Sequence, residues 1–232
     1  MKAIISVIVP VLDEAADLGA TLARLQPLRS RGHEVRVVDG GSRDATVAVA
    51  EPLSDVVLTA PRGRARQMNA GAEDARGDVL WFLHGDTLPP EDADGLILTA
   101  LADPRRHWGR FDARLSGSLP MLRVVETMMN LRSRVTGVAT GDQGIFVRRH
   151  TFQELGGYPS IPLMEDLALS DALLGRCRPV CLAQRVTTSS RRWERDGVWP
   201  TIFLMWRLRW AYRRGVDPVL LARRYYGFEA VD

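Results

Sequence analysis

Acidic side chains that follow apolar runs are the first candidates for chemistry in this sequence. Residues 35–38 are a β-branched run that predicts a buried strand, and Asp39 ends it. Gly40 and Gly41 follow, and they permit a positive φ and a close approach of a ligand to the backbone. Because open α/β sheets bind ligands at the carboxyl ends of their strands, Asp39 would suit the imide or hydroxyl donors of a nucleotide. Alternatively, Asp39 caps the helical pattern that resumes at Asp44, and the glycines only make the turn.

A second carboxylate follows the apolar run of residues 79–83, where Gly85 precedes Asp86. A hard divalent cation that bridges a diphosphate needs only one or two carboxylates besides phosphate oxygens and water. Asp86 is therefore predicted to hold Mg²⁺ or Mn²⁺, unless it is a turn residue bonded to its own backbone. His84 could help, although a single histidine at a strand end is more often structural.

Glu165 and Asp166 open a predicted helix after Pro159 and Pro162. Acidic residues in a first turn suit the helix dipole. A carboxylate at this place could also act as a general base that removes a proton from an acceptor hydroxyl. The residue types leave both interpretations open.

Basic residues could bind phosphate at two further places. Arg192 beside Trp193 could neutralise a leaving diphosphate while the indole stacks on a ring, or both could belong to a solvated basic surface. Arg62, Arg64 and Arg66 run into a helix start, which could hold phosphate or be exposed.

The elements that must position these residues alternate between strand and helix over the first 85 residues, which predicts βαβ units and a parallel sheet. We expect strands at residues 3–9, 35–38, 56–58 and 79–83, and helices at residues 18–28, 44–51 and 64–75. In the second half we expect strands at 108–115 and 145–148, and helices at 89–101, 121–135, 165–174 and 199–212. The second half should extend the first half's sheet, giving one α/β domain over residues 1–232.

Composition places the chain among ordinary globular proteins, with 232 residues, 46% hydrophobic and 25% charged. The net charge is +3, and thirty of the 31 basic residues are arginine, whose planar fork suits phosphate. The sequence shows no secretory signal and no apolar run long enough to cross a bilayer. Cys177 and Cys181 are interpreted as inert thiols, and a cytoplasmic location is expected.

The C-terminal segment is both basic and aromatic. Residues 191–224 contain nine arginines against three acidic residues, with aromatic side chains at helical spacing over residues 199–212. This pattern suits an anionic membrane surface on the cytoplasmic side, or a helix packed on the domain or in a homodimer. Residues 121–135 could form such a dimer interface. Nucleic acid is not an expected partner, because no groove-reading helix or RNA-stacking sheet is visible.

Taken together and in order, these segments resemble a family 2 glycosyltransferase with the GT-A fold. The resemblance extends from residue 3 to about residue 195 and looks closest to the bacterial transferase 2 subgroup associated with radical-SAM/selenodomain proteins. The matching segments are residues 7–14, 38–44, 84–87, 141–144, 165–166 and 192–193.

The resemblance implies a role for each matching residue. Residues 1–87 would form a nucleotide-binding half, residues 88–195 an acceptor half, and residues 196–232 a tail. Asp86 would match the last Asp of the family's D-x-D metal motif, and Asp166 its catalytic base, with Glu165 beside it, in a single displacement that inverts the anomeric carbon. The UDP- or GDP-linked donor would contact Pro10, Asp13, Glu14, Asp39, Gly40, Arg66, Asp86 and Trp193, and Arg192 would assist catalysis.

Two departures from the family pattern stand out. His84 replaces the first Asp of D-x-D, so the metal would depend on Asp86 and phosphate, and Ser189 replaces the Gln of Q-x-x-R-W. The second departure favours a single transfer over processive synthesis. A non-catalytic sugar-nucleotide sensor and a nucleotidyltransferase are the alternatives, although a sensor needs neither Glu165 nor Asp166.

Overall fold

The strands of the first half are short apolar runs that are buried on both faces. In the computed structural model, which describes residues 3–227, β1 (Ile5–Val11), β2 (Glu34–Asp39) and β4 (Val79–Phe82) are buried along their whole length. Burial of both faces is typical of parallel strands covered by helices. β2 and β4 pair in parallel with β1, and β3 (Val56–Thr59) pairs in parallel with β2.

The second half continues the same sheet, as the sequence predicts. β7 (Phe146–Arg148) lies antiparallel to β4, and β6 (Trp108–Leu115) lies antiparallel to β7. β8 (Val180–Thr188) is parallel to β6, and β5 (Thr87–Leu88) is antiparallel to β8. The result is one mostly parallel sheet in the order β3-β2-β1-β4-β7-β6-β8-β5 within a single α/β domain.

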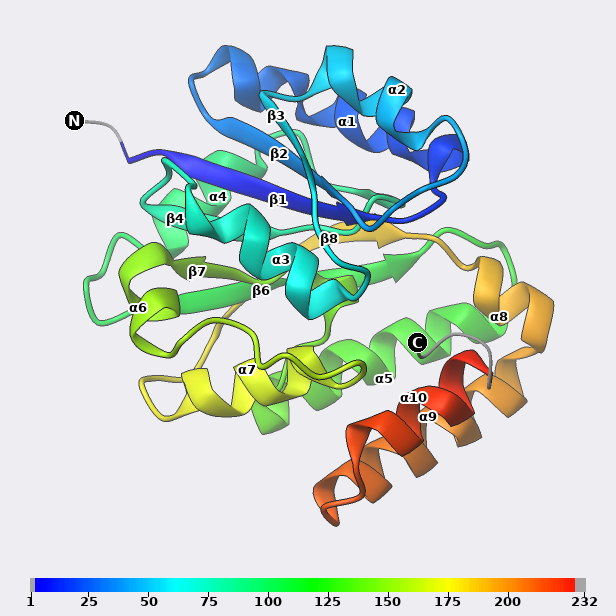
Figure 1. The fold of residues 1–232 in the computed structure, drawn as a ribbon. Helices are drawn as coiled ribbons and strands as arrows, with labels where there is room; N and C mark the ends of the chain where they lie inside the picture. Colours follow the sequence, from blue (N-terminus) through cyan, green and yellow to red (C-terminus); the bar gives the residue numbers. More distant parts are fainter. Residues whose placement is uncertain (1–2, 228–232) are drawn as a thin grey trace.

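Helices cover both faces of this sheet (Figure 1). On one face, α1 (Ala15–Ser30), α2 (Thr46–Ala50), the 3₁₀ turn Glu51–Leu53 and α4 (Ala93–Ala100) pack over one hydrophobic cluster. On the other face, α3 (Arg64–Glu73), α6 (Arg149–Glu154) and α7 (Glu165–Leu174) pack over a second cluster. Tyr158, Phe82 and Phe152 form an aromatic group in that second cluster.

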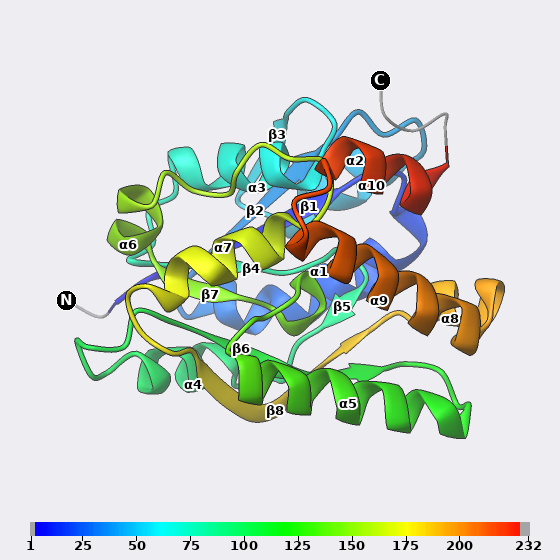
Figure 2. The same ribbon diagram turned by 90° about the horizontal axis from the view of Figure 1, so that it is seen from below.

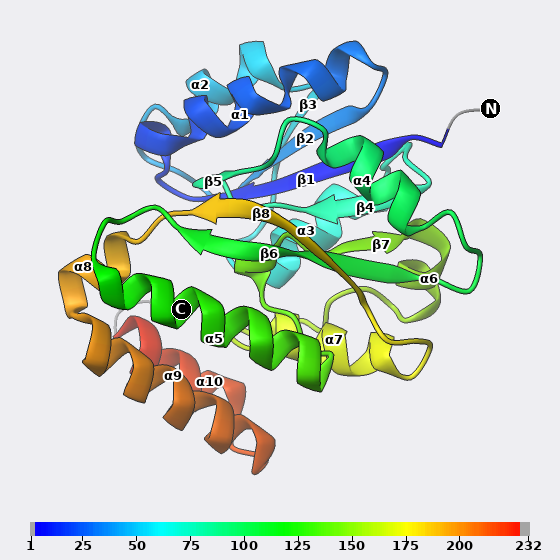
Figure 3. The same ribbon diagram turned by 180° about the vertical axis from the view of Figure 1, so that it is seen from behind.

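Four further helices lie along one side of the domain, as Figures 2 and 3 show. They are α5 (Pro120–Thr136), α8 (Arg191–Asp196), α9 (Val198–Arg213) and α10 (Pro218–Tyr226). The inner face of α5 packs with β6 and with the start of α9, while α10 and α9 pack together with α7. Within residues 3–227, no helix combines the length and the apolar character needed to cross a bilayer.

Some boundaries differ from those predicted, for physical reasons. β1 continues through Pro10, which the sequence analysis placed at the strand end, because Pro10 and Val11 still lie opposite Val38 and Asp39. β8 was not predicted: its middle residues are exposed and β6 shifts register against it at Phe111, so no regular alternation marks the strand. α10 was also missed. It begins at Pro218, a favourable first position, and Asp217 caps it by accepting a hydrogen bond from the Val219 N–H at 2.8 Å.

Candidate active site

Asp39, at the end of β2, organises the turn that follows it. Its carboxylate accepts hydrogen bonds from the backbone N–H of Gly41 at 2.9 Å and of Ser42 at 3.0 Å, and also from the Ser42 hydroxyl. Gly41 has a positive φ of +93°. At Gly40 a side chain is absent because Gln67 occupies the space: an added Cβ would lie 3.0 Å from Nε2 of Gln67. Asp39 therefore holds the turn but does not cap α2, which begins at Thr46 and whose first N–H donates to Asp44.

The loop after β1 is bonded to the loop after β2. The N–H of Asp13 donates to the Ser42 hydroxyl at 2.9 Å, and the N–H of Arg43 donates to the Asp13 carboxylate at 2.7 Å. The N–H of Glu14 donates to the Thr46 hydroxyl at 2.8 Å. Asp13 has a φ of +53°, which costs energy in a residue with a side chain, so these bonds hold a strained backbone in place.

Glu14 places a carboxylate against the loop that carries Asp86. Its Oε2 is buried and has no hydrogen-bond partner among the described residues, and an added Cβ at Gly85 would collide with this atom. Desolvation, followed by the nearby charge of Asp86, raises the pKa of Glu14 to about 7. The structure thus puts Glu14 beside the expected metal ligand, which the sequence did not indicate.

Asp86 lies at the mouth of this loop, with its side chain 23% exposed. Its nearest cation is Arg191, with Nη2 at 3.7 Å from the Asp86 carboxylate, and Arg191 also pairs with Asp17 at 2.7 Å. The preceding residue, His84, directs Nδ1 toward Asp142 at 3.4 Å. His84 therefore connects the loop of Asp86 with the turn at residues 141–144.

Asp166 is bonded to that same turn. One oxygen of its carboxylate accepts from the N–H of Gly141 at 2.9 Å, and the other accepts from the N–H of Leu167 at 2.8 Å. Gly141 in turn lies against the His84 ring, because an added Cβ there would meet Nε2. A series of neighbouring residues therefore connects the three carboxylates at one edge of the sheet. The first part runs from Asp39 through Ser42, Asp13, Glu14 and Gly85 to Asp86. The second part runs from His84 through Gly141 to Asp166.

Glu165 is held next to Asp166 with only 6% of its surface exposed. The residue before it, Met164, has a φ of +71°, so a second strained residue precedes a second buried acid. Burial, followed by the charge of Asp166, raises the pKa of Glu165 to about 7. Arg64, at the start of α3, opposes this rise and also opposes the rise at Glu14, which places its positive charge between the two acids.

Glu165 makes folding stability depend on pH in a direction that can be tested. An acid with a pKa of about 7 in the folded protein and about 4.5 when unfolded binds an extra proton in the folded state between these values. Stability should be fully present below pH 4.5 and fall as the pH rises to about 7, by at most about 3 kcal/mol. Glu165→Gln should therefore match the wild type at about pH 5 and exceed it at about pH 8 in urea unfolding.

Glu73→Gln is the matched control for this prediction, because Glu73 is exposed at the end of α3. It should leave the stability difference between the two pH values unchanged. A Glu165→Gln protein whose stability differs from the wild type by the same amount at both pH values would contradict the assignment.

The remaining predicted residues take other places. Pro10 is buried inside β1, and Arg66 is exposed, with no hydrogen bond or ion pair to the cluster within residues 3–227. The Arg192 guanidinium lies over the ring of Tyr225, 3.9 Å from its centroid. Trp193 packs against the cluster of Leu115, Leu122 and Val125. The cations that lie with the acids are Arg64 and Arg191, each one or two residues from a predicted one.

Comparison with known proteins identifies the family. The sequence model described as Glycosyl transferase family 2 matches residues 6–153, which is more than half of the chain. The chain belongs to glycosyl transferase family 2. Its fold and its family are therefore those of an enzyme, as the resemblance predicts.

The curated relatives of this family 2 glycosyltransferase include lipid-phosphate sugar transferases. An undecaprenyl-phosphate 4-deoxy-4-formamido-L-arabinose transferase of Aeromonas hydrophila is 33% identical over 110 residues, which cover 42% of this chain and 34% of the relative. The protein of the same name from Pseudomonas fluorescens is 29% identical over 165 residues, covering 63% of this chain and 46% of the relative. The chain spans less than half the length of these relatives.

Solved structures share the fold of this family 2 glycosyltransferase. The mannosyltransferase PcManGT from Pyrobaculum calidifontis, in complex with GDP-Man and Mn²⁺, superposes with a TM-score of 0.67 at 20% identity, over 97% of this chain and 65% of that chain. S. aureus TarS 1-349 in complex with UDP-GlcNAc gives a TM-score of 0.66 at 18% identity, over 80% of this chain and 58% of that chain. These similarities support the GT-A fold.

Proposed function

We propose that this family 2 glycosyltransferase moves a sugar from a UDP- or GDP-linked donor to a hydroxyl acceptor, with inversion and with Mg²⁺ or Mn²⁺. The observation that carries the proposal is the series of contacts that joins Asp39, Asp86 and Asp166 at the carboxyl edge of the sheet, where open α/β sheets bind ligands. Ser189 in place of the motif's Gln supports a single transfer, and we also propose the radical-SAM/selenodomain-associated subgroup, which the motif segments resemble.

The donor would bind over the loops that follow β1 and β2. Asp39, with the bonded loop of Asp13 and Glu14, would receive the base and the ribose. Arg64 and Arg191 are the cations nearest to the acidic cluster and suit the diphosphate. Solved relatives of the same fold hold GDP-Man or UDP-GlcNAc, which supports this type of donor.

The residues present fit a divalent cation. Asp86 offers a partly exposed carboxylate, and Glu14 offers beside it an oxygen that has no partner among the described residues. No group of three or more His, Cys, Asp or Glu within residues 3–227 could hold a metal by itself. A cation that bridges a diphosphate needs no such group, because phosphate oxygens and water complete its shell. When bound, the cation would act as a Lewis acid on the leaving diphosphate.

Asp166 would act as the general base. Two backbone N–H groups fix its carboxylate, so it is positioned to take the proton from an acceptor hydroxyl as that oxygen attacks the anomeric carbon. The hydroxyl oxygen forms the new glycosidic bond, and the bond from the anomeric carbon to the nucleoside diphosphate breaks. One displacement of this kind inverts the configuration.

Donor hydrolysis tests the proposal without knowledge of the acceptor. The purified protein should show a higher melting temperature with UDP or GDP when Mn²⁺ is present, and it should slowly release nucleoside diphosphate from one sugar nucleotide. Binding without any hydrolysis, in the presence of metal and a range of hydroxyl acceptors, would instead indicate a sugar-nucleotide sensor.

Two helices present matching apolar faces outside this site, and we propose that they contact a membrane surface. On α5 the exposed residues are Val124, Met128, Leu131 and Val135, and on α9 they are Trp199, Phe203, Trp206 and Trp210. Each set follows the spacing i, i+4, i+7, i+11, which makes a continuous stripe on a helix. These two sets are called the apolar stripes below.

Charge and chemistry select an anionic bilayer as the occupant of the apolar stripes. The arginines of α9 lie between its stripe residues, and amphipathic helices with arginine and tryptophan bind anionic lipid at the interface. Relatives that act on an undecaprenyl phosphate, according to their names, support a lipid-linked acceptor. We therefore propose a peripheral location on the cytoplasmic face of the membrane.

The double substitution Trp206→Ser with Trp210→Ser should weaken binding to anionic vesicles at least about tenfold, because it removes two large apolar side chains from the interface. Sedimentation with phosphatidylglycerol vesicles at low salt measures this. Ile4→Ser, which changes an exposed apolar residue at the start of the sheet, should have no effect. Unchanged vesicle binding would contradict the proposal, and so would a stable dimer that the double substitution dissociates.

A further inference from the structure

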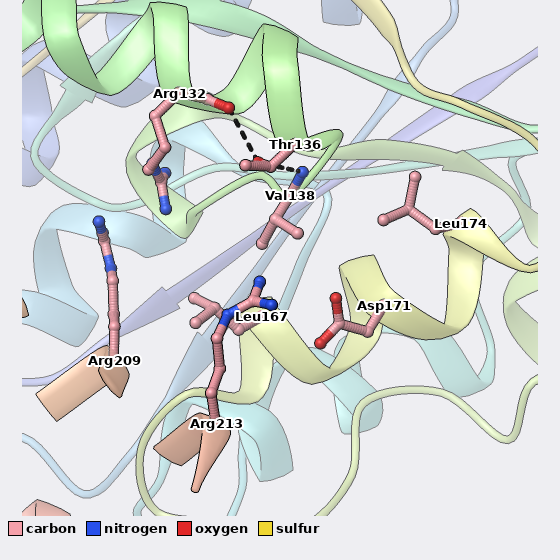
Figure 4. Close-up of a pocket in the computed structure, with 8 residues that line it drawn as sticks. All are labelled: Arg132, Thr136, Val138, Leu167, Asp171, Leu174, Arg209 and Arg213. Atoms are coloured by element: carbon pink, nitrogen blue, oxygen red, sulfur yellow. Dashed lines mark hydrogen bonds between the residues drawn. The ribbon is translucent and has the colours of Figure 1, made fainter. Parts of the chain in front are cut away.

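A pocket of about 340 Å³ lies between α5, α7 and α9. Arg132 enters it from α5, Arg209 and Arg213 enter from α9, and Leu167 and Asp171 form the wall on α7 (Figure 4). A volume of this size is within the range of small-molecule sites. Three guanidinium groups against one carboxylate make it a cationic pocket.

The positive charge of this pocket exceeds the negative charge that lines it, because three arginines face one carboxylate, that of Asp171. No residue in the described part of the chain forms an ion pair with Arg132, Arg209 or Arg213. The Nε and Nη2 atoms of Arg132 are buried and have no hydrogen-bond partner in residues 3–227. Figure 4 shows the guanidinium groups of Arg132 and Arg209 pointing toward one another.

Such an arrangement costs stability in the unliganded protein. Burial, followed by the charge of Arg209, lowers the pKa of Arg132 to about 10, and burial also lowers the pKa of Arg209. Both side chains are still charged at neutral pH. Partly buried cations that face each other with no ion pair to a described residue are unfavourable until an anion completes the site.

The pocket lies beside the proposed base, between the two helices that carry the apolar stripes. Its α7 wall begins one residue after Asp166, and the charge of Asp166 acts on both Arg132 and Arg209. Arg132 follows Leu131 in the α5 stripe, and Arg209 precedes Trp210 in the α9 stripe. An acceptor bound in this pocket would thus have one end near Asp166, and the rest of the acceptor would lie near the apolar faces of α5 and α9.

We propose that this pocket binds a phosphomonoester group of the acceptor. The proposal rests on the proposed function and adds the substrate class to it. Two or three arginine forks match the geometry and the charge of a phosphomonoester, which carries close to two negative charges at neutral pH. The ester can belong to a lipid headgroup or to a water-soluble phosphate, and both share the chemistry that the pocket recognises.

The test uses the full chain with Arg132→Gln and Arg209→Gln combined, and Arg207→Gln as the matched control. Arg207 is an exposed arginine on α9 that does not line the pocket. Inorganic phosphate and hexyl phosphate should raise the melting temperature of the wild type, with affinity reduced about ten- to a hundredfold in the double variant and unchanged in the control. Because the variant removes buried unpaired charge, its own melting temperature should not fall.

A second arm separates the two sources of phosphate. Vesicles with phosphatidic acid, a phosphomonoester, are compared with vesicles of equal surface charge made with phosphatidylglycerol, a phosphodiester. If the wild type prefers phosphatidic acid and the double variant does not, the acceptor is a lipid phosphomonoester. If only the soluble phosphates bind, and bind through these arginines, the acceptor is water-soluble.

Two results would overturn the proposal. One is that neither soluble phosphate nor phosphatidic acid depends on Arg132 and Arg209. The other is that the double variant loses the melting-temperature shift caused by UDP or GDP with Mn²⁺, since the pocket would then serve the donor diphosphate. Loss of that donor shift in the wild type itself would instead contradict the proposed function, so the two failures can be told apart.

Discussion

Replacing Asp166 by Asn should lower turnover by about 10²–10⁴-fold while leaving the affinity for the donor near that of the wild type. Asn keeps the shape of the side chain and an acceptor oxygen for one of the two N–H groups, of Gly141 and Leu167, but it cannot take a proton. Transfer to a hydroxyl acceptor measures the loss, and the melting-temperature shift with UDP or GDP and Mn²⁺ measures donor binding. Glu73→Gln is the control for a change from carboxylate to amide on the surface.

The size of this effect also reports on the nucleophile. An ionised phosphate oxygen of the acceptor would need no base, so Asp166→Asn would then cost little while substitution of Arg132 and Arg209 would cost much. That result would contradict Asp166 as the base. An equal loss of donor affinity would contradict it as well, because it would show that Asp166 holds the donor.

Asp86→Ala is the second substitution for which we expect a large effect. It removes the partly exposed carboxylate of the proposed metal site, so Mn²⁺-dependent donor affinity should fall at least about a hundredfold. It also removes the charge that contributes to the raised pKa of Glu14 and leaves Arg191 paired with Asp17 alone. Donor and metal binding should therefore weaken together.

Calorimetric titration of UDP or GDP, with Mn²⁺ and with EDTA, measures the coupling of donor and metal. In the wild type EDTA should remove most of the donor affinity, and in Asp86→Ala it should change little. Asp92→Ala is the matched control, because Asp92 is exposed before α4 and its side chain caps no helix N–H. A variant at Asp86 that still gains affinity from Mn²⁺ would place the metal elsewhere.

Much of the fold follows from residue periodicity. β6 and α7 begin and end at the predicted residues, because each is a regular pattern bounded by turn residues. Because the acids come directly after predicted strands, the sequence also indicated that they would lie at the carboxyl edge of the sheet. β8 escaped prediction because its pairing with β6 shifts register and its centre is exposed, so tertiary pairing and not local pattern defines that strand.

The acids of the candidate site stand at positions that the local sequence pattern indicates, and the neighbouring cations do so much less. Asp39 ends β2, Asp86 lies in the loop between β4 and β5, and Asp166 lies in the first turn of α7, and such positions can be found from the sequence. Arg64 was indicated only as one of three arginines at a helix start, and the positions of Arg64 near Glu165 and of Arg191 near Asp86 depend on segments that lie far apart in the chain. The same holds for Glu14, whose burial against Gly85 results from the packing of two loops.

Asp13 and Met164 carry a practical consequence for anyone who selects heat-resistant variants of this molecule. Both hold a left-handed backbone conformation directly before an acid that is kept from water. Glycine at either position would relieve the backbone strain, but at Asp13 it would remove the carboxylate that accepts from the Arg43 N–H, and at Met164 it would remove a side chain that is only 6% exposed. Selection for thermal endurance alone should therefore retain both residues, and with them the rigidity that positions the neighbouring carboxylates.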